Sequence, residues 1–171
     1  MKLLDSREFP LIFGSVDQFL LGVSPEVSGS LVNELAVFLD ITSRFWEAEG
    51  IGFALPQSWA LMDELWHSAI LCTSEYQNFS SKSAGHWVDH FPEARLNEGL
   101  DTFDYNPQWN FLNRNLSDAR YRLWLYELPR IAPVWKVCAI KANHVVPDIL
   151  RRKLAFDLVR SITPSLKVLA N

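Results

Sequence analysis

The sequence predicts an all-α protein with a single domain over residues 1–171, an irregular helical bundle around a long central helix at about residues 57–83. Apolar residues recur at spacings of three and four along several long stretches, which is the period of an α-helix. The length of 171 residues suits one domain. With 49% hydrophobic residues, 11 Phe and 7 Trp, the chain carries enough apolar area for a sizeable core.

Two helices are expected in the first 50 residues. Ser15 and Gln18 fit a capping box, which predicts a short helix that ends near Leu21. A longer helix is expected over 27–49, with Gly50 as its C-terminal stop. Its apolar stripe recurs at steps of four, three, four and three. The stripe consists of Leu31, Leu35, Phe38, Thr42 and Phe45.

The central helix is predicted from the absence of a helix breaker between Gln57 and Gly85. One face repeats at helical spacing, and a second apolar row at seven-residue steps widens it, so the helix should pack on several sides. The face consists of Trp59, Met62, Trp66, Ala69, Thr73 and Tyr76. The polar run 80–83 is interpreted as a solvated helix end, and Gly85 as its C-cap.

The second half of the chain has weaker patterns. A short helix is expected at 93–100, and a loop at 101–110 with a turn at Asn106-Pro107. Ser117-Asp118 should start a helix that runs to about Leu128. The segment 132–142 fits either a buried helix or a short strand. A clear helix is expected at 147–163, which packs with 27–49 on the central helix.

Charge is unevenly distributed along the chain. Residues 1–110 hold 5 Lys and Arg against 16 Asp and Glu, a net charge of −11. Residues 111–171 hold 11 Lys and Arg against 4 Asp and Glu, a net charge of +7. The basic region 111–171 could contact an acidic partner such as nucleic acid. The alternative, favoured by the overall pI of about 5.5, is that two oppositely charged halves pack together.

Several classes of protein are disfavoured. The N-terminal apolar stretch is a poor signal peptide, and no run reaches the length of a membrane span, which predicts a cytoplasmic protein that does not enter a membrane. Cys72 and Cys138 lie far apart and match no C-x-x-C pattern, which favours two buried thiols. The chain has neither a phosphate-binding loop nor a dinucleotide fingerprint.

Histidines and carboxylates gather in one part of the central segment. On a helix, Asp63 lies four residues before His67 and Glu64 three, so both carboxylates share a face with the imidazole. His86 and His90 follow Gly85 and would meet His67 if the chain folds back. Two or three imidazoles with a carboxylate are a credible site for a divalent metal, zinc or iron.

Other interpretations of these residues stay open. His67 and His90 could be core histidines that hydrogen-bond to carboxylates or backbone and stack on Trp66 and Trp87. The same groups could also perform acid–base catalysis without a metal, since a carboxylate beside an imidazole orients a general base. The sequence does not specify a reaction or a substrate.

The central segment also resembles a known family, the glycine-rich domain-containing proteins, which occur in plants and have small bacterial relatives of unknown function. The resemblance covers residues 56–92 and rests on an Asp-x-x-Trp-His motif with spaced residues after it. The residues are Met62-Asp63-Glu64-Leu65-Trp66-His67, Ile70-Leu71-Cys72-Thr73, Tyr76, Phe79, Gly85, His90 and Pro92. It implies a mostly helical domain whose core motif holds Asp63, Trp66, His67 and His90, and it implies no established reaction.

The chain departs from that family pattern at two positions. Relatives often have a basic residue where this chain has His86, and a histidine where it has Asp89. The resemblance therefore retains His67 and His90 as a pair and makes His86 a weaker candidate. The glycine-rich tail of the plant proteins is absent.

Two functions follow as hypotheses. The first is a helical accessory protein that binds a protein partner, because the sequence has no complete catalytic motif and has a split charge and a surplus of aromatic residues. The second is a metal-binding protein or metal-dependent enzyme that uses His67 and His90, with Asp63 or Glu64 in support.

Overall fold

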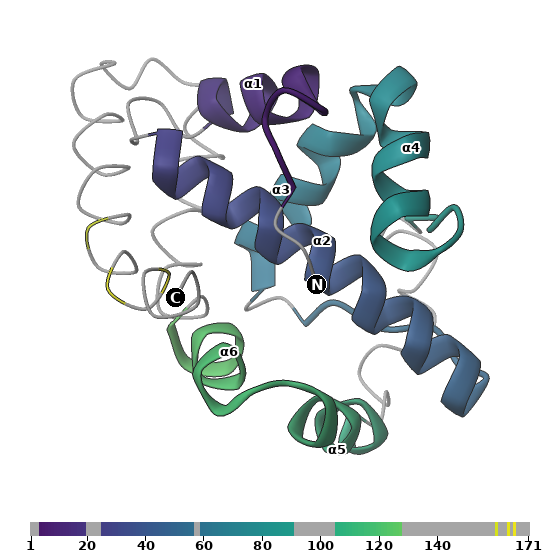
Figure 1. The fold of residues 1–171 in the computed structure, drawn as a ribbon. Coiled ribbons are helices and arrows are strands. Elements are labelled where there is room, and N and C mark those ends of the chain that lie inside the picture. Colours follow the sequence, from purple (N-terminus) through teal and green to yellow (C-terminus); the bar gives the residue numbers. More distant parts are fainter. Residues whose placement is uncertain are drawn as a thin grey trace, which may run out of the picture.

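The computed structural model describes residues 4–19, 25–56, 59–90 and 105–127, together with Arg160, Pro164 and Leu166. Every regular element in these residues is helical (Figure 1), which confirms the predicted all-α class. None of these helices is long and apolar enough to cross a membrane. The elements are α1 (Pro10–Phe19), α2 (Pro25–Glu49), α3 (Ala60–Ile70), α4 (Thr73–Ala84), α5 (Asn106–Asn115), α6 (Asp118–Arg122) and the π-helix η4 (Leu123–Glu127).

Helix α2 is the centre of the fold and matches the predicted helix at 27–49. It runs diagonally through the molecule in Figure 1 and contacts α1, α3, α4 and α5. Fifteen of its 25 residues are buried. Gly50 ends the helix with a φ of 68°, and its N–H donates to the carbonyl of Trp46 at 2.9 Å. A left-handed glycine is a common helix stop because it has no Cβ to clash with the chain.

The predicted continuous helix at 57–83 is wrong, because α3 and α4 are separate helices. The Cys72 N–H donates to the carbonyl of Ala69 at 3.0 Å, and Cys72 leaves the helical region with a ψ of 55°. Helix α2 contacts both halves, and the turn lets Trp66 on α3 and Tyr76 on α4 both be buried. Leu71, at the corner, is 81% exposed. Tertiary packing on α2 therefore breaks a segment that has no glycine or proline.

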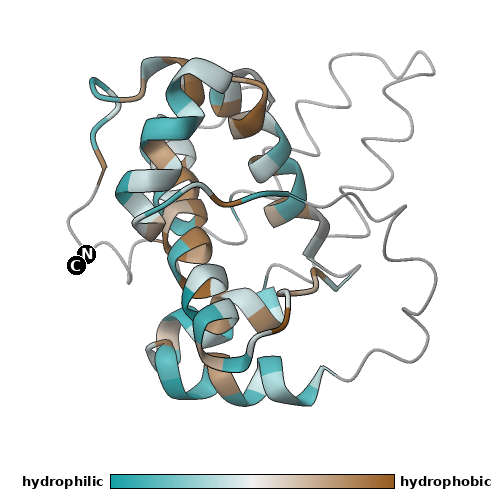
Figure 2. Ribbon diagram, turned by 90° about the vertical axis from the view of Figure 1, so that its right-hand side faces the viewer, coloured by the Kyte–Doolittle hydropathy of each residue, from teal (hydrophilic) through white to brown (hydrophobic). Residues whose placement is uncertain are grey.

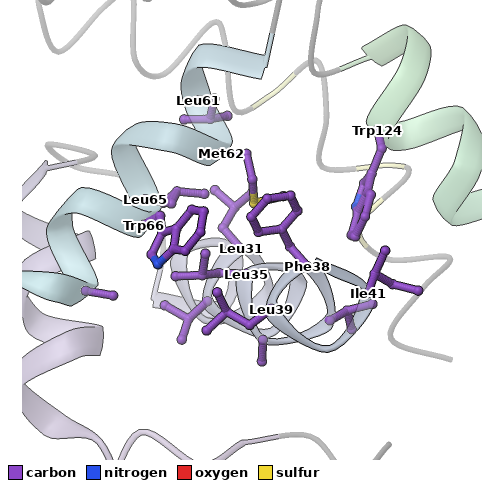
Figure 3. Packing of buried hydrophobic residues seen from close by; sticks show 14 of the residues in the cluster. Leu31, Leu35, Phe38, Leu39, Ile41, Leu61, Met62, Leu65, Trp66 and Trp124 are labelled. Carbon is purple, nitrogen blue, oxygen red and sulfur yellow. The ribbon is translucent and has the colours of Figure 1, made fainter. Parts of the chain in front are cut away.

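Aromatic rings join the helices in the core. Phe38 on α2 meets the rings of Phe53, Trp59, Trp66 and Trp124 edge-on, at centroid distances of 5.6, 6.3, 5.4 and 5.9 Å. Figure 3 shows Trp66 and Trp124 approaching the Phe38 side chain from two different helical segments. Each such pair contributes about 0.5–1.5 kcal/mol beyond the area it buries.

The predicted short helix near residue 15 begins earlier than expected. Helix α1 starts at Pro10, and the Glu75 carboxylate of α4 accepts hydrogen bonds from the N–H groups of Leu11 and Ile12, each at 3.0 Å. A carboxylate at a helix N-terminus accepts hydrogen bonds from N–H groups that have no partner within the helix. Its negative charge is also attracted to the positive end of the helix dipole. The cap comes from 64 residues away, so the local sequence could not reveal it.

The helices after residue 105 differ in part from expectation. The loop predicted at 101–110 is wrong from residue 106, where α5 begins with Pro107 in its first turn, a favourable place for proline. Ser117 caps α6 as predicted, since its Oγ accepts from the Arg120 N–H. The helix predicted at 93–100, the segment 132–142 and nearly all of 147–163 lie outside the described residues.

Apolar and polar residues alternate along the helices in Figure 2, as expected for amphipathic helices around a shared core. Several polar residues are nevertheless buried, and one of them is a carboxylate. Glu34 on α2 is 4% exposed, and its carboxylate accepts two hydrogen bonds from the Arg120 guanidinium, at 2.9 and 3.0 Å. The indole N–H of Trp124 donates a third at 3.0 Å. These bonds attach α6 and η4 to α2.

The Arg120→Met variant should lower the free energy of unfolding by about 3 kcal/mol, because the Glu34 charge would stay buried without its ionic partner. Urea unfolding followed by circular dichroism measures the loss. Arg122→Met is the matched control, since Arg122 is an exposed residue of the same helix, and its change should stay within about 0.5 kcal/mol. Equal effects of the two substitutions would contradict the assigned role of the buried ion pair.

Candidate functional site

Helix α3 presents a carboxylate and an imidazole on one face. Asp63 and His67 are four residues apart, and Asp63 Oδ2 lies 3.8 Å from His67 Nδ1. Glu64 Oε2 lies 4.0 Å from the same nitrogen. The predicted sharing of a helix face is therefore confirmed for all three residues.

The chain folds back on α3 after α4. Gly85 ends α4 with a φ of 81°, and its N–H donates to the carbonyl of Ser81 at 2.9 Å, which confirms the predicted C-cap. Residues 87–90 then run without regular structure and bring His90 to Asp63. The His90 Nε2–H donates to Asp63 Oδ1 at 2.9 Å, across 27 residues of sequence. The rings of His67 and His90 lie 4.5 Å apart between centroids.

The three residues of this cluster differ in their exposure to solvent. The His90 side chain is 9% exposed and meets the Trp66 ring edge-on, at a centroid distance of 4.6 Å. The His67 side chain is 45% exposed, and Asp63 is intermediate between them. The site therefore has a largely buried wall formed by the side chains of His90 and Trp66, and an open side at His67.

Asp63, His67 and His90 each offer one ligand atom, and these three atoms lie within 4.8 Å of one another. Two ligands of one zinc or iron ion, each about 2.0–2.2 Å from the metal, stand roughly 3–3.5 Å apart. The pair formed by His90 Nε2 and Asp63 Oδ1 already has such a separation. His67 stands farther away, with its Nδ1 3.8 Å from Asp63 Oδ2.

The predicted site residues thus separate into groups. Asp63, His67 and His90 come together, while Glu64 stands beside them. His86 points elsewhere: its Nε2 lies 2.6 Å from Ser43 Oγ on α2, and its Nδ1 lies 2.6 Å from the Trp87 carbonyl. This position agrees with the prediction that His86 is a weaker candidate ligand than His67 and His90.

Sequence reasoning missed two residues that hold the returning segment. The interpretation of 80–83 as a solvated helix end is wrong for Ser83, which is buried, and for Ser80, which is fully buried. The Ser80 Oγ donates to the His86 carbonyl at 3.0 Å and accepts from the Val88 N–H at 2.8 Å. Tyr76, assigned to the inner face of the helix, also donates its hydroxyl hydrogen to the Val88 carbonyl at 2.7 Å. The four-residue spacing of Tyr76 and Ser80 was the available signal.

The surroundings of His90 agree only in part with the interpretation of His67 and His90 as core histidines. The structural interpretation expected hydrogen bonds to carboxylates and stacking on Trp66 and Trp87. His90 has the first of these and contacts Trp66, whereas the Trp87 ring meets Tyr76 at 4.9 Å. His67 is too exposed for a core histidine, and this exposure distinguishes the cluster from a purely internal pair.

No protein-family model, curated protein or solved structure matches the chain. The resemblance to the glycine-rich domain-containing proteins therefore stays a prediction that rests on its motif.

Burial raises the pKa of Tyr76 to about 12, above its ordinary value of 10.0. Between these two values the folded protein keeps a proton that the unfolded chain has lost, so the stability from this group should decline as pH rises from about 10 to about 12. Urea unfolding across this pH range measures the decline, and Tyr76→Phe should reduce its slope. Absorbance at 295 nm should show one tyrosine titrating later than the others.

Proposed function

We propose that this protein binds a divalent transition metal, zinc or iron, through Asp63, His67 and His90. The observation that carries the proposal is the convergence of the three side chains, with His90 arriving from 27 residues away along the chain. The motif shared with the glycine-rich domain-containing proteins includes the same three residues and supports the proposal.

The donor set favours this class of metal. Two imidazoles and one carboxylate suit zinc and iron, whereas calcium and magnesium prefer oxygen ligands alone. Three protein ligands leave at least one coordination position for water or a substrate, as in catalytic rather than structural zinc sites. The open side at His67 would give access to that position, and Glu64 Oε2 stands nearby, 4.0 Å from His67 Nδ1. We therefore extend the proposal to a metal-dependent enzyme that uses this site.

Metal binding would replace one existing interaction. The His90 Nε2–H group donates a hydrogen bond to Asp63, and a nitrogen that binds a metal must carry no hydrogen. Binding through Nε2 would thus require the neutral imidazole to carry its hydrogen on Nδ1, and it would put the ion where the hydrogen bond was. The short His90–Asp63 distance means that these two ligands need little rearrangement.

Metal titration tests the proposal directly. The wild-type protein, stripped with a chelator, should take up about one zinc ion per chain, measured by competition with a chromophoric chelator. His67→Ala and His90→Ala should each weaken the affinity by at least about tenfold, because each removes a ligand. Elemental analysis of the protein as purified shows which metal it carries.

Asp63→Asn should likewise weaken the zinc affinity, because it removes the carboxylate ligand, and Asp40→Asn is its matched control. Asp40 lies on α2 and pairs with Arg44 at 3.4 Å, outside the cluster, so its loss should leave the zinc affinity unchanged. A wild-type protein that takes up no zinc or iron, with histidine variants that are only less stable, would establish the structural interpretation instead.

We infer a second candidate function from the surface, the binding of a protein partner. Leu71 and Leu11 are 81% and 54% exposed, and both line an open hollow of about 390 Å³ between α1 and the start of α4. Trp46 and Tyr126 are exposed elsewhere. Large exposed apolar side chains are typical of interaction sites when they cluster. Nucleic-acid binding by 111–171 and a cytoplasmic location stay predictions.

A pull-down from native lysate tests the partner. We expect the wild-type protein to capture a partner that Leu71→Asp no longer captures, because a charge would enter an apolar contact. The folded state of Leu71→Asp, checked by thermal unfolding, should match the wild type, since the side chain is exposed. A capture profile no different from that of empty resin would count against a partner.

A further inference from the structure

The position of His90 depends on two side chains of α4. Residues 87–90 have no helix or strand to hold them. Ser80 bonds to both the His86 carbonyl and the Val88 N–H, at 3.0 and 2.8 Å. Tyr76 bonds to the Val88 carbonyl at 2.7 Å. Val88 therefore has both of its backbone polar groups attached to α4, two residues before the proposed metal ligand.

The Tyr76 hydroxyl also connects this segment to α3. It accepts a hydrogen bond from the indole N–H of Trp66 at 2.7 Å while it donates to the Val88 carbonyl. An indole N–H can only donate and a carbonyl can only accept, so the directions of both bonds are determined. Trp66 precedes His67 in the sequence, and its ring contacts His90. One buried hydroxyl thus links the two elements that carry the proposed ligands.

We propose that Tyr76 and Ser80 are positioning residues that hold His90 against Asp63 and His67, so that docking of residues 86–90 and metal occupancy form one coupled equilibrium. The inference rests on the proposed metal site and names the residues that control its affinity. Without the docked segment the site would keep only Asp63 and His67, a much weaker pair of ligands.

The coupling works in both directions. If only a fraction of the population has the segment docked, the apparent metal affinity is the affinity of the docked state multiplied by that fraction. Linkage requires the reverse as well, so bound metal must favour the docked state by the same free energy. Metal should therefore slow the opening of 86–90, and weakening the hydrogen bonds of Val88 should weaken metal binding.

Tyr76→Phe tests the inference with little change in shape. The phenyl ring keeps the edge-on contact with Trp87, whose centroid lies 4.9 Å away, and only the hydroxyl is lost. The zinc affinity, measured by chelator competition, should fall about tenfold, in the range seen when groups that orient metal ligands are removed. In hydrogen exchange, zinc should protect the Val88 and Asp89 amides less in the variant than in the wild type.

Two further variants separate positioning from general stability. Ser80→Ala removes the second attachment and should also weaken zinc binding, whereas Tyr126→Phe changes an exposed tyrosine of η4 and should not. In a His90→Ala background, Tyr76→Phe should have no further effect on zinc affinity, because the ligand that it positions is gone. A purely structural role would lower the affinity by the same factor in both backgrounds.

The outcomes distinguish this inference from the proposal on which it rests. A wild-type protein without zinc or iron affinity overturns both. A wild type that binds zinc, with unchanged affinity in the folded Tyr76→Phe and Ser80→Ala variants, overturns the positioning role alone.

Discussion

Burial of α2 on several sides is the constraint on which the rest of the structure depends. The polar side chains on the buried part of this helix do not face water, so they need hydrogen-bond partners within the protein. Asn33 accepts from the Leu4 N–H at 2.7 Å, Glu34 binds Arg120, and Ser43 meets His86 at 2.6 Å. The polar residues of α2 therefore attach the N-terminus, α6 and the segment after α4.

The third of these attachments connects the core to the candidate site. His86 opens the segment that carries His90, and it is anchored to α2 through Ser43 and to α4 through its carbonyl and Ser80. Two proposed ligands thus stand on a helix, where the backbone hydrogen bonds hold them, and the third stands on a segment held by side chains. Such a segment opens more readily than a helix, because fewer interactions must break. The affinity of the site for a metal would follow from that balance.

The hydrogen bond between His90 and Asp63 is compatible both with a core histidine and with the proposed metal site. The asymmetry of the cluster favours the proposed metal site, because the His90 side chain is 9% exposed and the His67 side chain is 45% exposed. A histidine pair kept only for packing would enclose both rings. The open side at His67 would give access to the proposed site, and catalytic zinc sites keep one coordination position open.

The sequence by itself determined the local features of this protein. Helical periodicity predicted α2, the glycines predicted the ends of α2 and α4, and the four-residue spacing placed Asp63 and His67 on one face, because each depends on neighbours within about one turn. Only the tertiary structure decided the break at Leu71–Cys72, the burial of Ser80 and the meeting of His90 with Asp63. These depend on contacts between residues far apart in the chain, which no local pattern encodes. The helix surface that looked solvated at Ser80 is the surface onto which the chain folds back.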